Sequence, residues 1–152
     1  MSQKPRLNYH ALAPKASKAL AQLSYATTID RRLKELVNLR ISQINGCAFC
    51  IDMHWADLVK QGMDPRHLNA IAGWREAHRF FGEKERAALN WAEAVNALPH
   101  RVPSDADFEE MQKHFSDTEI AEITFIVGAI RAWNMLNASF HMPVPEAPFS
   151  AG

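Results

Sequence analysis

The sequence predicts an all-α protein, a helical bundle of about six to seven helices. In the segment 30–45 apolar residues recur at the three- and four-residue intervals of one helix face, at Leu33, Leu36, Val37, Ile41 and Ile44. Capping residues and prolines stand where such segments begin and end. No segment alternates apolar and polar residues between turn residues, so we expect no β-sheet.

The first half of the chain predicts four helices, over residues 14–27, 30–45, 47–61 and 63–77. Asp30 is the expected N-cap of the second helix. Gly62 is the expected end of the third, because glycine tolerates the left-handed conformation that follows many helices. Asp64 and Pro65 give the fourth a strong start signal, an N-cap followed by proline at the first helical position.

The second half predicts three more helices, over residues 83–98, 104–115 and 116–140. The last of them starts with a capping box, in which Ser116 and Glu119 satisfy each other's backbone N–H groups. Between Ile123 and Ile130 this helix is apolar over most of its circumference. Such a helix is usually buried, so we expect it either at the centre of the core or in a subunit interface.

Composition sets bounds on the function. The chain has 152 residues, 47% hydrophobic and 22% charged, and zero formal net charge. We therefore expect one domain over residues 1–152 and no binding to nucleic acid, which needs a basic surface. The N-terminus lacks the apolar stretch of a signal peptide, and the run 123–130 is too short to span a membrane. These features predict a cytoplasmic protein without a membrane anchor.

Both cysteines of the chain lie in the motif CAFCIDMH, which places Cys47, Cys50 and His54 at offsets of three and four. On a helix these offsets form one stripe of neighbouring side chains. The start of a helix favours a thiolate, and a histidine can exchange a proton near neutral pH. In a reducing compartment such a cysteine pair is typically catalytic or metal-binding.

A carboxylate is expected to join this stripe from the preceding helix. Glu35 does not share the apolar face of segment 30–45. If the two helices pack antiparallel through the turn at residues 44–47, Glu35 faces the middle of the next helix. A carboxylate beside an imidazole and a thiol makes a proton relay possible.

Other interpretations of the motif stay open at this level. Cys47, Cys50, His54 and Glu35 could together bind zinc, although closed structural sites prefer more Cys or His ligands. The two thiols could also be inert core residues. A thioredoxin-like oxidoreductase would require a βαβ context, which the sequence lacks. Trp55, directly after His54, could shape the mouth of a pocket or simply pack in a core or interface.

Glu35 followed by LRISQINGCAFCIDMHWADLVKQG resembles the core motif of the AhpD-like alkylhydroperoxidases, within the carboxymuconolactone decarboxylase superfamily. The family pattern is a Glu, then CxxC, then a His four residues after the second Cys, and all four positions match. The later stretches ERAALNWAEAV and FSDTEIAEITFIVGAIRAWNMLNASF are also similar to single-domain members. The resemblance covers roughly residues 20–140, with the motif core at 30–62.

The resemblance implies an all-α homo-oligomer, a trimer or hexamer, that reduces hydroperoxides with its cysteine pair. Cys50 would attack the peroxide, Cys47 would resolve the sulfenic acid as a disulfide, and Glu35 with His54 would relay protons. No bound cofactor is expected. An external dithiol on a partner protein, of lipoyl or thioredoxin type, would restore the pair. From the residues alone, the helix start favours Cys47 as the more acidic thiol, whereas His54 favours Cys50.

One position departs from the family pattern, since the founding members have a His where this chain has Phe49. A polar member of the relay is therefore missing, and a different rate or oxidant is possible. Two alternatives to the peroxidase are a decarboxylase of the same superfamily and a non-catalytic redox sensor. The first has no need of a dithiol, and the second would oxidise without turnover.

Overall fold

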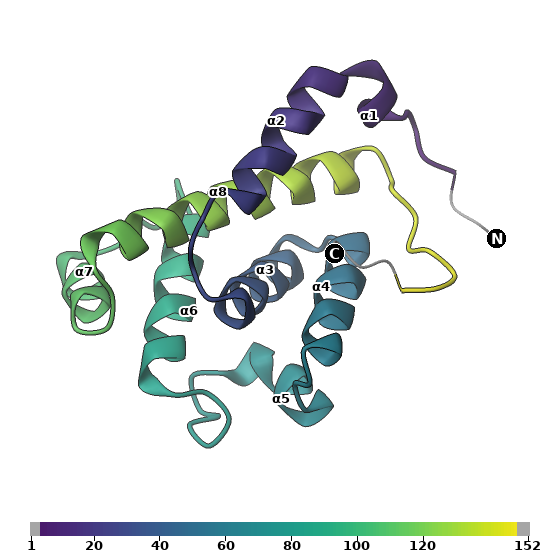
Figure 1. Ribbon diagram of the computed structural model, residues 1–152. Helices are drawn as coiled ribbons and strands as arrows, with labels where there is room; N and C mark the ends of the chain where they lie inside the picture. The colour runs from purple at the N-terminus through teal and green to yellow at the C-terminus, as the bar shows by residue number, and fades with distance from the viewer. Residues whose placement is uncertain (1–3, 149–152) are drawn as a thin grey trace.

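A computed structural model describes residues 4–148 of the chain, and in this range every regular element is helical. The all-α prediction is confirmed, with eight α-helices where about six to seven were expected. The elements, shown in Figure 1, are α1 (Tyr9–Leu12), α2 (Pro14–Tyr25), α3 (Arg31–Asn45), α4 (Ala48–Lys60), α5 (Pro65–Asn69), the 3₁₀ helix η1 (Ile71–Gly73), α6 (Glu83–Asn96), α7 (Asp105–Gln112) and α8 (Asp117–Ser139).

The predicted start signals are observed, but one predicted helix is wrong in extent. Asp64 accepts a hydrogen bond from the backbone N–H of Arg66, and Pro65 opens α5. This helix ends at Asn69, and a 3₁₀ turn and further turns replace the rest of segment 63–77. The irregular path still buries the apolar residues Leu68, Ile71 and Trp74 in one cluster, so packing overrides the helical pattern. The four-residue α1 was not predicted because it is too short to show a period.

Helix α3 lies at the centre of the bundle, with α4, α6 and α8 packed against it (Figure 1). Leu33, Val37 and Ile41 belong to a cluster that contains apolar residues of α6 and α8. Leu36 and Leu39 belong to a second cluster, formed with α4 and the segment around α5 and η1. Two separate apolar faces therefore hold α3 in place.

A third stripe of α3 is polar and yet buried. It consists of Glu35, Asn38 and Ser42, spaced three and four residues apart. Asn134 of α8 donates a hydrogen bond to the Ser42 hydroxyl at 3.0 Å. Buried polar groups need partners, so this stripe marks where α3 faces other polar side chains instead of apolar core.

Helix α8 is a core element that runs along one side of the bundle. It contacts α2, α3, α4, α6 and α7. Its buried residues include Ile123 and Ile130, as the sequence predicted, while Phe125 and Met135 are 59% and 62% exposed. The homo-oligomer stays a prediction. Among the residues described, no helix combines the length and apolarity that crossing a membrane requires.

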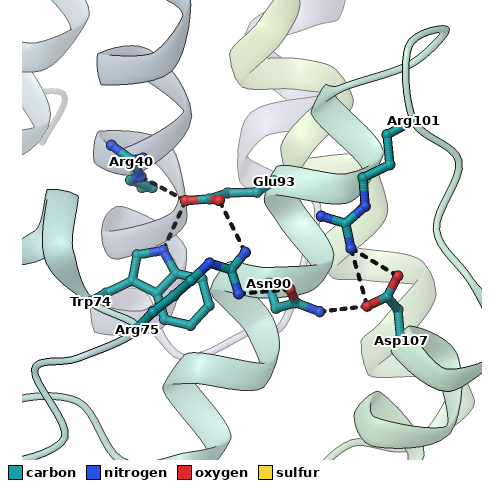
Figure 2. A network of polar contacts seen from close by, with 7 residues as sticks. All are labelled: Arg40, Trp74, Arg75, Asn90, Glu93, Arg101 and Asp107. Carbon is teal, nitrogen blue, oxygen red and sulfur yellow. Dashed lines mark hydrogen bonds and ion pairs between the residues drawn. The ribbon is translucent and has the colours of Figure 1, made fainter.

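A polar network centres on Glu93 of α6 (Figure 2). Its Oε1 accepts hydrogen bonds from Arg40 Nε at 2.7 Å and from Trp74 Nε1 at 2.8 Å. Its Oε2 accepts one from Arg75 Nη2 at 3.3 Å. Burial raises the pKa of Glu93, but the hydrogen bonds from Trp74 and Arg40 outweigh this, and the pKa is lowered overall.

The network continues to α7 through Asn90. Arg75 donates to Asn90 Oδ1 at 3.1 Å, and Asn90 donates to Asp107 Oδ1 at 2.7 Å. Arg101 donates to Asp107 Oδ2 at 3.1 Å (Figure 2). The backbone N–H of Ser104, together with Asn90 and Arg101, holds the pKa of Asp107 well below its ordinary value. The network thus ties α3, α6 and α7 together by charge-assisted hydrogen bonds.

We expect Glu93→Gln to lower the free energy of unfolding near pH 7 by about 1.5–3 kcal/mol, because Arg40 and Arg75 lose a charged acceptor. The lowered pKa of Glu93 means that its contribution is present above its ordinary value of 4.5 and is lost as the pH falls below it. Urea unfolding should therefore show a difference between wild type and variant that shrinks on acidification. Glu110→Gln, at an exposed carboxylate, is the control; an equal effect there would contradict the role of Glu93.

Candidate active site

A tight reversal joins α3 to α4 and places the first cysteine. Gly46 adopts the left-handed conformation, with φ of +71°. The backbone N–H groups of Gly46 and Cys47 bond to Gln43 O at 3.3 Å and to Ser42 O at 3.1 Å, which ends α3. Cys47 is at once the N-cap of α4, one residue earlier than the first-turn position that the sequence predicted. Its Sγ accepts the backbone N–H of Cys50 at 3.3 Å.

Cys47 and Cys50 form a disulfide. Both are fully buried, at 2% and 0% exposure, in the cluster that α3 shares with α6 and α8. The alternative of two inert thiols does not fit paired sulfurs. The structure therefore shows the oxidised form of a pair whose position at a helix start suits thiol–disulfide exchange.

The structure brings Glu35 of α3 to His54 of α4, as antiparallel packing through the reversal predicts. His54 Nδ1 and Glu35 Oε2 are hydrogen-bonded at 2.5 Å, and both side chains are buried. The other ring nitrogen, Nε2, is buried and has no hydrogen-bond partner within residues 4–148. A buried polar atom without a partner costs about 1–3 kcal/mol, which makes Nε2 the atom available to a bound molecule.

Two residues that the sequence analysis missed complete the surroundings of the disulfide. Asn137 of α8 donates its Nδ2–H to Cys50 Sγ, with an N–S distance of 3.4 Å. Tyr9 of α1 donates its hydroxyl hydrogen to Asn137 Oδ1 at 2.6 Å. Burial raises the pKa of Tyr9, so the phenol stays protonated and remains a donor. The available signal for Asn137 was its helical spacing, since it stands three residues after Asn134 and seven after Ile130, on the helix face that carries the apolar residues.

A cavity of about 290 Å³ adjoins this polar cluster. Glu35, His54 and Asn137 belong to the polar part of its wall, which also includes Tyr9, His10, Ser24, Tyr25, Lys34 and Asn38. The rest of the wall is apolar and includes Phe49, Met53, Ile126, Ile130 and Trp133. The two cysteines are not part of this wall; Asn137 lines the cavity and also contacts Cys50 Sγ, so its amide lies between the cavity and the disulfide. Trp55 is 40% exposed and does not line the cavity, so it does not shape the mouth of this pocket; Trp133 lines the cavity wall.

The zinc alternative required Cys47, Cys50, His54 and Glu35 to converge. Within the part of the chain that the structure describes, the acidic, His and Cys groups that converge are instead Glu35, His54 and Asp57, with ligand atoms within 4.8 Å of one another. The spacing would allow these three to hold a metal ion. However, Glu35 and His54 bond directly to each other, and the cysteines bond to each other, so the predicted four-ligand set does not form.

Comparison with known proteins places the fold and the motif in one family. Residues 12–94 match the carboxymuconolactone decarboxylase family. The chain belongs to the carboxymuconolactone decarboxylase family. The uncharacterized protein YdfG of Bacillus subtilis (strain 168) is 31% identical over 140 residues, which cover 90% of this chain and 93% of that protein.

Solved structures agree with this placement. ATU0492 from Agrobacterium tumefaciens, a protein of unknown function suggested to be an antioxidant defence protein AhpD, is 37% identical with a TM-score of 0.89, over 95% of this chain and 100% of that one. The predicted resemblance to AhpD-like family members is thereby confirmed. The debrominase Bmp8 has a TM-score of 0.78 at 23% identity, over 91% of this chain and 75% of that one, and so shares the fold alone.

Gly46→Ala should destabilise the protein by about 1–2 kcal/mol, because alanine pays a steric cost in the left-handed region. A Cβ at Gly46 would meet no atom within 4 Å, so the cost comes from the backbone alone. Gly73→Ala is the matched control, since its Cβ would also enter open space and its φ is not positive. Thermal unfolding of both variants checks this; equal midpoints would show that the reversal does not depend on glycine.

Proposed function

We propose that this protein is a thiol-dependent hydroperoxide reductase that cycles Cys47 and Cys50 between dithiol and disulfide. The observation that carries the proposal is the placement of this disulfide at the start of α4, behind a cavity wall that contains the Glu35–His54 pair. The AhpD suggestion made for ATU0492 supports the same chemistry. A dithiol, a proton relay and an apolar cavity are the parts that two-electron reduction of an organic hydroperoxide needs.

In the first step the Cys50 thiolate attacks the terminal oxygen of the hydroperoxide. An S–O bond forms as the O–O bond breaks, the sulfur is oxidised to a sulfenic acid, and the alkoxide leaves as the alcohol after taking up a proton. In the second step the Cys47 thiolate attacks this sulfur and displaces hydroxide, which leaves as water after protonation. The product is the Cys47–Cys50 disulfide that the structure shows.

A two-electron reductant must then reopen the disulfide. In our proposal it is an external dithiol, of lipoyl or thioredoxin type, on a partner protein. One of its thiolates attacks a sulfur of the disulfide and forms a mixed disulfide, and its second thiol releases the reduced cysteine pair. The partner is left as a disulfide, so electrons and protons balance over the cycle.

Glu35 and His54 are assigned the proton transfers. The hydrogen bond from Nδ1 to the Glu35 carboxylate fixes the imidazole tautomer, so that Nε2 can take a proton and return it to the leaving oxygen. Among residues 4–148 Nε2 is buried without a hydrogen-bond partner, which fits this role. The size and apolar wall of the cavity favour organic hydroperoxides with a compact hydrocarbon group over hydrogen peroxide.

Single cysteine variants test the assignment of the two thiols. Cys50→Ser should abolish consumption of cumene hydroperoxide under a recycling dithiol, because the attacking sulfur is gone. Cys47→Ser should trap Cys50 as a sulfenic acid, detectable by dimedone labelling and intact mass. The reverse pattern would exchange the two roles. Full activity in the double variant would instead favour a dithiol-independent enzyme such as a decarboxylase, and oxidation without turnover would favour a redox sensor.

Glu35→Gln should slow oxidation of the reduced pair by roughly 10²–10⁴-fold at neutral pH, the range attributed to general acid–base catalysis. The substitution keeps the shape of the side chain but removes the charge that orients His54. Glu85→Gln is the control, since Glu85 is also part-buried and ion-paired, with Arg32, but lies outside the cavity. Stopped-flow kinetics of both variants measure the effect, and an unchanged rate in Glu35→Gln would exclude this carboxylate from the relay.

A further inference from the structure

Asn137 holds a position between the cavity and the sulfur that no part of the predicted motif accounts for. It lines the cavity, and its side-chain amide lies 3.4 Å from Cys50 Sγ. It is 5% exposed, so water does not compete effectively for the amide. The contact spans 87 residues of sequence and therefore depends on how α8 packs against the start of α4.

The direction of this hydrogen bond matters for chemistry. The amide presents its N–H group, a donor, to a sulfur that is a weak acceptor in a disulfide. When the pair is reduced and Cys50 ionises, the same N–H faces a full negative charge, and charge-assisted hydrogen bonds are roughly twice as strong as neutral ones. The contact is therefore worth more in the thiolate form than in either the thiol or the disulfide form.

Tyr9 fixes this direction. Its hydroxyl donates to Asn137 Oδ1 at 2.6 Å, so the amide oxygen is directed toward Tyr9 of α1. The amide N–H group is thereby directed toward the sulfur. Tyr9 is 6% exposed and packs near the ring of Phe140, which follows α8. A rotated amide would place its oxygen against the thiolate and repel it. The N-terminal helix thus contributes a residue to the chemistry of the α4 cysteine.

We propose that Asn137 is a catalytic hydrogen-bond donor that stabilises the Cys50 thiolate, and that Tyr9 is the positioning residue that orients its amide. This deepens, and rests on, the proposed thiol chemistry by identifying what selects Cys50 as the attacking sulfur. It also makes Cys50 the better leaving thiolate when a reductant attacks Cys47. The titratable groups that line the cavity with Asn137 are Tyr9, His10, Tyr25, Lys34, Glu35 and His54. Asp57 lies beside Glu35 and His54, Cys47 lies beside Cys50, and α8 contributes the uncharged amide.

The test measures the ionisation of Cys50 without any peroxide. In a Cys47→Ser background Cys50 is the one remaining thiol, and serine keeps an acceptor at the N-cap. The pKa follows from the thiolate absorbance near 240 nm and from the pH dependence of iodoacetamide alkylation. Asn137→Leu, which nearly conserves volume, should raise this pKa by roughly one to two units. Tyr9→Phe should raise it by less.

A double-variant cycle separates orientation from general loosening. Once Asn137 is leucine, Tyr9→Phe should change the thiol pKa no further, because the phenol acts through the amide. Asn134→Ala is the matched control: it lies one turn earlier on α8, is equally buried, and bonds to Ser42 instead of sulfur. It should lower stability and leave the pKa unchanged.

An unchanged Cys50 pKa in Asn137→Leu would overturn the proposal, and so would an equal rise in Asn134→Ala. If Asn137→Leu does not fold, Tyr9→Phe and Asn137→Ala decide the matter. Alanine removes the N–H donor without adding a charge beside the sulfur, so it should also raise the pKa. A raised pKa in a protein that consumes no hydroperoxide would leave this inference standing while the proposed reductase activity fails.

Discussion

The reversal of the chain at Gly46 is the constraint on which the rest of the site depends. Because Gly46 takes a left-handed conformation, Cys47 can end the hydrogen-bond pattern of α3 and cap α4 in the same residue. Two helices joined so tightly can fold back against each other, and α3 and α4 do so. A residue well back on α3 then meets a residue well forward on α4, and this brings Glu35 to His54 without any long loop. The backbone conformation of Gly46 thus determines which residues of α3 and α4 meet in the polar cluster.

The energetic cost of this arrangement is a set of buried polar side chains in the middle of the bundle. Two apolar faces of α3 pack into separate clusters, and they hold the third, polar stripe against α4 and α8. Glu35 is satisfied by His54, and Asn137 by Tyr9 and Cys50. One atom of the set, His54 Nε2, lacks a hydrogen-bond partner among the described residues. It is the atom to which we assign the proton transfer. The two apolar clusters around the site therefore stabilise the fold, whereas the buried polar side chains of the site contribute less to stability.

Local chain geometry explains what could be predicted from the sequence. The helical period gave the fold class, and a two-helix argument placed Glu35 near His54, because both steps involve residues close in sequence. Asn137 and Tyr9 were not predicted, since their contacts span 87 and 128 residues and are fixed only by the packing of α1 and α8. The helix predicted over residues 63–77 was too long, because the apolar pattern of this segment fits either a helix or a series of turns. The homo-oligomer and the cytoplasmic location stay predictions.

The proposed function requires that a hydroperoxide oxidise Cys47 and Cys50 to the disulfide of the structure. Intact-mass spectrometry of the fully reduced protein, before and after one equivalent of cumene hydroperoxide, tests it most directly. We expect a loss of the mass of two hydrogen atoms, no remaining free thiol, and one equivalent of the corresponding alcohol. An unchanged mass with both thiols free and the hydroperoxide intact would contradict it.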